Sequence, residues 1–106
     1  MVIGEGSLTR TRPQTVLALE GEFDAARASD AHKRMLRLDL RPGGRLVLDL
    51  SGLTFMDSTG IRMILRASEY ARTHCAALVV VRPPDHVMRV LELIGLDDQL
   101  DLVDGV

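Results

Sequence analysis

The sequence lacks the features that mark several large classes of protein. Its 106 residues carry a net charge of only −2, and its basic residues do not gather in clusters, so the electrostatic footprint of a nucleic-acid-binding protein is missing. No apolar run approaches the length that a bilayer-spanning helix needs. The first residues have neither the basic start nor the apolar core of a signal peptide. We therefore expect a cytoplasmic protein that binds neither nucleic acid nor a membrane.

Patterns typical of disulfides, metals and nucleotides are also missing. The one cysteine, Cys75, cannot form an internal disulfide, which suits a reducing compartment. Because it lies between a predicted helix and a predicted buried strand, we expect it to be a small apolar packing residue. The histidines show no metal-ligand spacing, and no phosphate-loop Lys-Ser/Thr follows Gly43 and Gly44. The sequence therefore predicts neither a metal nor a cofactor.

What the sequence does contain is an alternation of strand-like and helix-like segments, without repeats or linkers, at the length of one domain. The strands are expected at residues 15–20, 45–50, 77–81 and 100–103, and the helices at residues 25–38, 59–74 and 85–94. An additional strand at residues 3–10 is expected to form a hairpin with the first strand, and residues 51–57 are expected to be a loop. The order predicts an α/β fold: a mixed sheet of four to five mostly parallel strands with three to four helices.

The same periodicity predicts which faces of the elements are buried. The all-apolar strand at residues 77–81 is expected to be covered on both faces. Asp24 is placed to cap the first helix, and Gly95 ends the third. The expected inward residues are Ala28, Ala31, Met35 and Leu38 in the first helix, Ile61, Ile64, Leu65 and Ser68 in the second, and Val87, Leu91 and Ile94 in the third.

Strands joined by helices through right-handed crossovers are parallel, so the C-terminal ends of the first three strands are expected to meet at one edge of the sheet. That edge would carry residues 21–24, 51–60 and 82–84. In open α/β sheets, ligands and partners bind at such an edge. The fold alone does not fix the function, which must be argued from the residues at the edge.

The most unusual segment is residues 55–61, in which two apolar residues lead into Asp57-Ser58-Thr59-Gly60 and a helical pattern begins. In a purely structural interpretation, Asp57 or Ser58 caps the helix by accepting a hydrogen bond from a first-turn amide. In a functional interpretation, the Ser58 hydroxyl is held at the surface beside the positive end of the helix dipole, where a phosphate is tolerated. A phosphate would add about −1.5 to −2 charges, and we expect it to alter docking more than stability.

Two charged residues nearby have alternative interpretations. Asp49 is either a buried acid near the site or, as we favour, a strand-end carboxylate that accepts hydrogen bonds from loop amides. Arg62 lies one turn into the second helix. Its side chain is expected either on a solvated face, which is the commoner case, or leaning back toward a phosphate at Ser58.

Four ordered segments resemble one protein family. Gly21-Glu22-Phe23-Asp24, residues 47–52, residues 55–61 and residues 84–96 are similar to the corresponding parts of the anti-sigma-factor antagonists. These proteins are single copies of the sulfate transporter and anti-sigma antagonist (STAS) domain. The resemblance covers about residues 15–104 and implies that residues 1–106 form a single STAS domain.

The resemblance also implies a function and a set of partners. Ser58 matches a serine that is phosphorylated by an anti-sigma factor, which is itself a serine kinase with bound nucleotide. The unphosphorylated form would bind this kinase and release its sigma factor, phosphorylation would abolish binding, and a serine phosphatase would reset Ser58. No enzymatic activity and no cofactor are implied for the chain itself. The candidate partner-binding residues are Asp24, Asp57, Ser58, Thr59, Gly60 and Arg62.

Two alternatives belong to other functional classes. The chain would be a STAS accessory subunit of a membrane transport ATPase if it bound constitutively without phosphorylation, although the intact Asp57-Ser58-Thr59-Gly60 segment argues against this role. It would be a small hydrolase if Ser58 were a nucleophile and His86 its base, but nothing in the sequence specifies that geometry.

Overall fold

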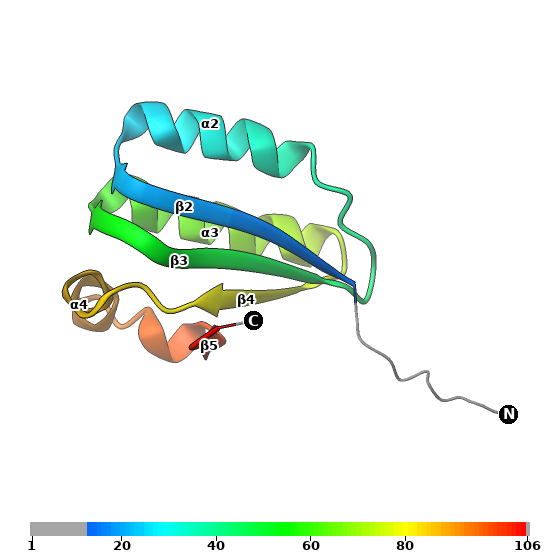
Figure 1. Ribbon diagram of the computed structural model, residues 1–106. Helices are drawn as coiled ribbons and strands as arrows, with labels where there is room; N and C mark the ends of the chain where they lie inside the picture. The colour runs from blue at the N-terminus through cyan, green and yellow to red at the C-terminus, as the bar shows by residue number, and fades with distance from the viewer. Residues whose placement is uncertain (1–12, 106) are drawn as a thin grey trace, which may run out of the picture.

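The computed structural model describes residues 13–105, which form a parallel four-stranded sheet with the strand order β2-β3-β4-β5 (Figure 1). The elements are β2 (Gln14–Phe23), α2 (Ala25–Leu36), β3 (Arg45–Met56), α3 (Ser58–Thr73), β4 (Ala77–Val81), α4 (Asp85–Leu93), the 3-10 helix η1 (Asp97–Gln99) and β5 (Leu102–Val103). This architecture confirms the predicted α/β class. The strand expected at residues 3–10 lies outside the described residues.

All three α-helices contribute to one main core on the sheet. Alternate residues of β3, among them Leu46 and Leu48, are fully buried in this core together with Ile64 of α3 and Leu91 of α4. The intervening Val47 belongs to a second, smaller cluster with Val79 and Val81 of β4. Successive side chains of a strand point to opposite faces, so β4 is buried at both parities, as the apolar run at residues 77–81 predicted.

β2 and β3 pair over a longer stretch than the sequence predicts. The prediction of a loop at residues 51–57 is wrong for residues 51–56, which belong to β3. β3 continues to Met56 and pairs with β2 as far as Phe23, through two register shifts that begin after Ala18 and after Gly21. Gly21 has φ +68, a conformation open mainly to glycine and typical of an irregularity in a strand. The residues that suggested a turn therefore mark irregular strand pairing.

The buried face of α3 also differs from the expected one. Ile64 is buried as predicted, but Leu65 is 51% exposed and Ser68 is exposed. The buried residues are Gly60, Met63, Ile64, Ala67 and Ala71. Several of them are small, and small residues let a helix approach a strand closely. The expected stripe was therefore wrong at Leu65 and Ser68, whereas Ile61 is half-buried and packs against the main core.

Two further packing predictions are wrong. Ile94 follows the end of α4 and is 51% exposed, whereas Val87 and Leu91 are buried as predicted. Cys75 is exposed rather than packed. It has φ +55 in the turn between α3 and β4, and its carbonyl accepts a hydrogen bond from the amide of Gly43 (2.9 Å). Both residues lie just beyond a helix end, where the helical periodicity no longer sets the direction of a side chain.

Candidate functional site

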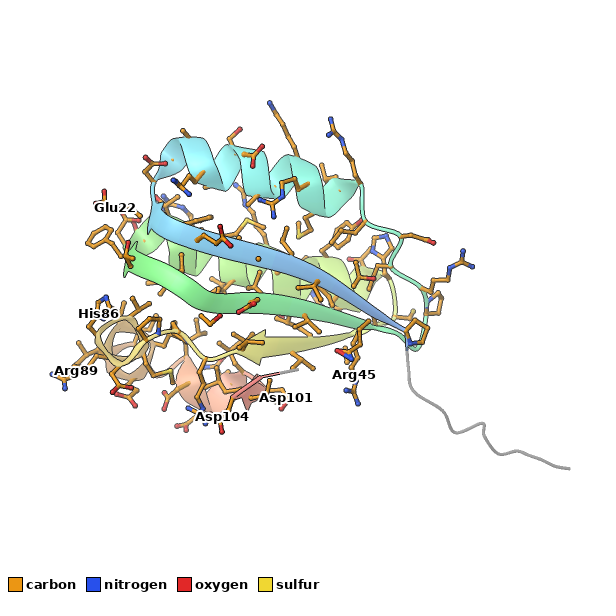
Figure 2. All side chains as sticks on the ribbon, viewed as in Figure 1. Glu22, Arg45, His86, Arg89, Asp101 and Asp104 are labelled. Carbon is orange, nitrogen blue, oxygen red and sulfur yellow. The ribbon has the colours of Figure 1, made fainter. Side chains whose placement is uncertain are left out.

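The sheet brings the starts of α2 and α3 to neighbouring positions. Phe23 and Met56 are paired in the parallel register of β2 and β3, and the next residue after each is an aspartate, Asp24 and Asp57. Each aspartate is the N-cap of the helix that follows. Figure 2 shows Glu22 and His86 at this end of the sheet and Arg45 at the opposite end. The predicted grouping at one edge is therefore present.

Both aspartates use a side-chain oxygen to hold the first turn of their helix. Oδ1 of Asp57 accepts a hydrogen bond from the Thr59 amide (2.8 Å), and Oδ1 of Asp24 accepts one from the Arg27 amide (3.0 Å). The predicted cap at Asp24 is confirmed, and of the two candidates for the second cap, Asp57 fills the role. Ser58 is thereby left as the first helical residue of α3.

Ser58 is exposed, and its hydroxyl forms no hydrogen bond with any other residue of the described part of the chain. The helix axis places this hydroxyl beside the positive end of the α3 dipole, where added negative charge is favoured. The local arrangement therefore leaves an unengaged hydroxyl at the surface, at a helix start of the kind that suits a phosphate.

The other candidate residues on α3 differ in accessibility. Arg62 is exposed, Thr59 is half-buried and Gly60 is buried. A β-carbon on Gly60 would lie 2.2 Å from Cγ of Met56, so the absence of a side chain lets α3 pack against the end of β3. The structure thus places four of the candidate residues at the surface, Asp24, Asp57, Ser58 and Arg62, while Gly60 is buried at the contact between α3 and β3.

Two other polar side chains, those of His86 and Asp49, form hydrogen bonds with β3. Nε2 of His86 lies 2.7 Å from the Thr54 carbonyl oxygen, and since a carbonyl only accepts, Nε2 is the donor. Oδ1 of Asp49 accepts hydrogen bonds from the amide (3.0 Å) and hydroxyl (2.7 Å) of Ser51. The favoured interpretation of Asp49 is therefore correct in that a nearby amide binds the carboxylate, but wrong in its position, because Asp49 and Ser51 both lie within β3 rather than at a strand end and in a loop.

Phe55 is a surface feature of this edge that the sequence analysis missed. It is 53% exposed, next to the buried Met56, and lies opposite Glu22 in the register of β2 and β3. Consecutive side chains of a strand point to opposite faces, but Leu53, two positions before Phe55, is buried, so regular alternation alone does not predict an exposed Phe55. The alternation changes at the register shift where Gly21 and Glu22 of β2 pair with Leu53 and Phe55. Exposed aromatic residues are enriched at protein interfaces.

Residues 13–105 contain no group of three side chains arranged to hold a metal ion. Within the same range, no helix is both long and apolar enough to cross a membrane.

Comparisons with known proteins point to one family of domains. The family model for the "Mlab, STAS domain" matches residues 7–104. Two curated relatives, from Listeria monocytogenes and Listeria innocua, are each named anti-sigma-B factor antagonist. Each is 29% identical over 82 residues, which is 77% of this chain and 72% of the relative.

Two solved structures share the fold. The unphosphorylated anti-sigma factor antagonist SpoIIAA has a TM-score of 0.71 at 20% identity, over 91% of this chain and 83% of that one. At this identity the likeness supports the fold alone. The STAS domain of a SulP transporter from Vibrio cholerae has a TM-score of 0.66 at 25% identity, over 89% of this chain and 75% of that one.

Proposed function

Because the chain belongs to the STAS domain family, we propose that it is an anti-sigma-factor antagonist whose binding to a kinase partner is controlled by phosphorylation at Ser58. One observation carries the proposal: the Ser58 hydroxyl is exposed at the first residue of α3 and forms no hydrogen bond within the described residues. The names of the Listeria relatives, both anti-sigma-B factor antagonists, support the same class of function.

In the unphosphorylated state, the edge around Ser58 docks onto the anti-sigma factor, which then releases its sigma factor. Phe55 supplies an exposed aromatic side chain at this edge, and Asp24 and Asp57 supply carboxylates. Aromatic anchors commonly contribute much of the binding energy of an interface. The unphosphorylated edge therefore combines an apolar contact with polar groups of defined orientation.

Phosphorylation is a transfer from the nucleotide held by the partner. Oγ of Ser58 attacks the γ-phosphorus of ATP, the bond to the ADP oxygen breaks, and the hydroxyl proton passes to a base of the kinase. No base on this chain is required, which agrees with the engagement of His86 Nε2 by the Thr54 carbonyl. A serine phosphatase reverses the step by hydrolysing the phosphoserine.

The phosphate acts as a switch because of the charges around it. It adds about −1.5 to −2 charges within an edge that already carries Glu22, Asp24 and Asp57, all of them exposed. A docked phosphoserine must lose hydration and face like charges. A loss of about 3 kcal/mol of binding free energy raises the dissociation constant more than a hundredfold, which is sufficient for release.

The test uses the serine-kinase anti-sigma factors encoded in the same genome. Incubation with the partner kinase and ATP is expected to add one phosphate to the wild-type chain and none to Ser58→Ala, as read by intact-mass spectrometry. In titration calorimetry, Ser58→Ala should bind the kinase regardless of ATP treatment, and Ser58→Asp should bind weakly. Equal affinities of the two variants, or a wild-type chain that gains no phosphate, would contradict the proposal.

A second candidate function is favoured by one observation, the similarity to the STAS domain of a SulP transporter at 25% identity. In that role the chain would associate constitutively with a membrane transport protein, as a transport ATPase accessory subunit would. A chain that gains no phosphate from any of the kinases, and binds a transport protein equally well as wild type and as Ser58→Asp, would support this function instead.

A further inference from the structure

A groove runs along the seam between α2 and α3, starting beside the Ser58 edge. Its first part is a hollow of about 310 Å³, lined on α2 by small residues and His32, and on α3 by Thr59, Arg62, Met63 and Arg66. A second hollow of about 410 Å³ follows and shares His32 and Arg66 with the first. The residues on each helix are spaced by three and four positions, so each set lies on one helix face.

The part of the groove nearest Ser58 is cationic and unpaired. Arg62 and Arg66 are exposed, and neither forms an ion pair or hydrogen bond with another described residue. The acidic residue that lines the far hollow, Glu69, is already paired with Arg72. Arg62 and Arg66 are four positions apart, so they repeat at about 6 Å along the helix axis. The two guanidinium groups thus form a short row without a carboxylate partner among the described residues.

The far part of the groove is apolar. Leu36, which is 56% exposed, lines it together with Met35 and Tyr70. His32, at the junction, has a buried Nδ1 with no hydrogen-bond partner among the described residues. The exposed leucine and the aromatic ring suit an apolar side chain of a partner, and the row of arginines suits acidic side chains. The surface therefore fits an amphipathic, acidic segment.

We propose that this groove receives an acidic segment of the anti-sigma factor kinase, with carboxylates paired to Arg62 and Arg66 and an apolar side chain placed against Leu36 and Tyr70. The inference rests on the proposed function and extends its docking surface from the Ser58 edge to the length of the α2–α3 seam. The groove is continuous with the Ser58 edge, because Thr59 lines the groove and directly follows Ser58. This continuity supports the proposal. Arginine pairs carboxylates in a bidentate geometry that gives an interface both affinity and register.

The groove also gives phosphorylation of Ser58 a second way to weaken binding. Ser58 and Arg62 are four positions apart on α3, a spacing at which side chains of a helix interact. A phosphate on Ser58 therefore competes with a partner carboxylate for Arg62. Phosphorylation would act at both places, by placing a dianion in the edge and by withdrawing one of the two arginines from the groove.

The experiment measures the affinity of the partner kinase for charge-reversed variants. Arg66→Glu is expected to weaken binding about tenfold or more. Arg45→Glu makes the same charge change at the opposite end of the sheet, as Figure 2 shows, and should change the affinity less than about twofold. Leu36→Ala should weaken binding several-fold. The loss in Arg66→Glu should be accompanied by a weaker dependence of affinity on salt concentration, which a purely structural effect would not produce.

The possible outcomes separate this inference from the proposed function. If Ser58→Asp binds weakly while Arg66→Glu and Leu36→Ala bind as the wild type does, the groove is not part of the docking surface and the proposed function stands. If Arg45→Glu weakens binding as much as Arg66→Glu, only the total charge matters and the inference is overturned. If the unphosphorylated wild type binds no kinase, the function and the groove fail together. Urea unfolding of each variant checks that the fold is intact.

Discussion

At the scale of single residues, Asp57 has a structural role in the candidate site, as the N-cap of α3. Its carboxylate accepts the Thr59 amide, so Asp57→Ala should lower the free energy of unfolding by about 1 kcal/mol. Asp57→Asn removes the same charge but keeps an oxygen that can accept this bond, and should retain most of the stability. Urea denaturation of the three proteins checks this. An equal loss in both variants would mean that charge, rather than the cap, stabilises the start of α3.

Gly60 is the position at which α3 meets the end of β3. A β-carbon there would lie 2.2 Å from Cγ and 2.7 Å from Sδ of Met56. Gly60→Ala should therefore destabilise the protein by about 1–3 kcal/mol, despite the better helix propensity of alanine. Combining it with Met56→Ala should give less destabilisation than the sum of the two single changes.

The control for this clash is Gly105→Ala, since a β-carbon on Gly105 would meet no atom within 4 Å. Additive effects of Gly60→Ala and Met56→Ala would contradict the packing argument. Because Gly60 is buried, a loss of kinase binding in its variants must be compared with their loss of stability before it is assigned to the interface.

Residue-level predictions succeeded where the cause is local. A cap needs only a suitable polar residue before a helix: Asp24 was predicted in this way, and Asp57 was one of the two candidates for the second cap. The exposure of Cys75 and of Phe55 was not predicted, because it depends on where a helix ends and on how β3 pairs with β2. Element ends are set by tertiary pairing, here by the register of β2 against β3, which no short sequence window contains.

At the scale of elements, the type and order of the segments followed from periodicity alone. β4 has the predicted bounds, Ala77–Val81, because an uninterrupted apolar run leaves little choice. β3 extends six residues beyond the expected end, from Leu50 to Met56, because β2 offers a continuous pairing edge that tolerates irregularities at Gly21 and Gly52. Intrinsic turn signals yield to such pairing, since strand propensity depends strongly on context.

α4 provides a direct test of the observed helix faces. Leu91 is fully buried, whereas Leu93, two positions later, is 83% exposed. Leu91→Ala should lower the free energy of unfolding by about 2–5 kcal/mol through the cavity it leaves. Leu93→Ala and Ile94→Ala should change it by less than about 0.5 kcal/mol. Thermal or urea unfolding measures all three, and a large loss in Ile94→Ala would restore the inward orientation that the sequence suggested.

At the scale of the whole molecule, the exposed residues of the candidate site lie on the rim of a core that they do not help to build. The main core joins buried residues of the three described α-helices and of β2, β3 and β4, and Leu102 of β5 packs against it. In contrast, Asp24, Asp57 and Ser58 are exposed. The surface can therefore change its charge without disturbing the packing beneath it. This separation is what a docking switch requires, because both states must remain folded.

The separation predicts how phosphorylation affects folding. A phosphate on Ser58 gains about 0.3–1 kcal/mol from the α3 dipole and about 0.2–0.5 kcal/mol from Arg62 at the i+4 position. It loses a comparable amount through repulsion from Asp24 and Asp57, so its net effect on the free energy of unfolding should be within about 0.5 kcal/mol. The m-value in urea should be unchanged, because m follows the surface exposed on unfolding. The same modification should weaken kinase binding more than a hundredfold, equivalent to about 3 kcal/mol. A phosphorylated chain with a lower m-value or a broad transition would instead indicate a switch that works by partial unfolding of α3, in which case docking would fail for lack of a helix rather than by charge.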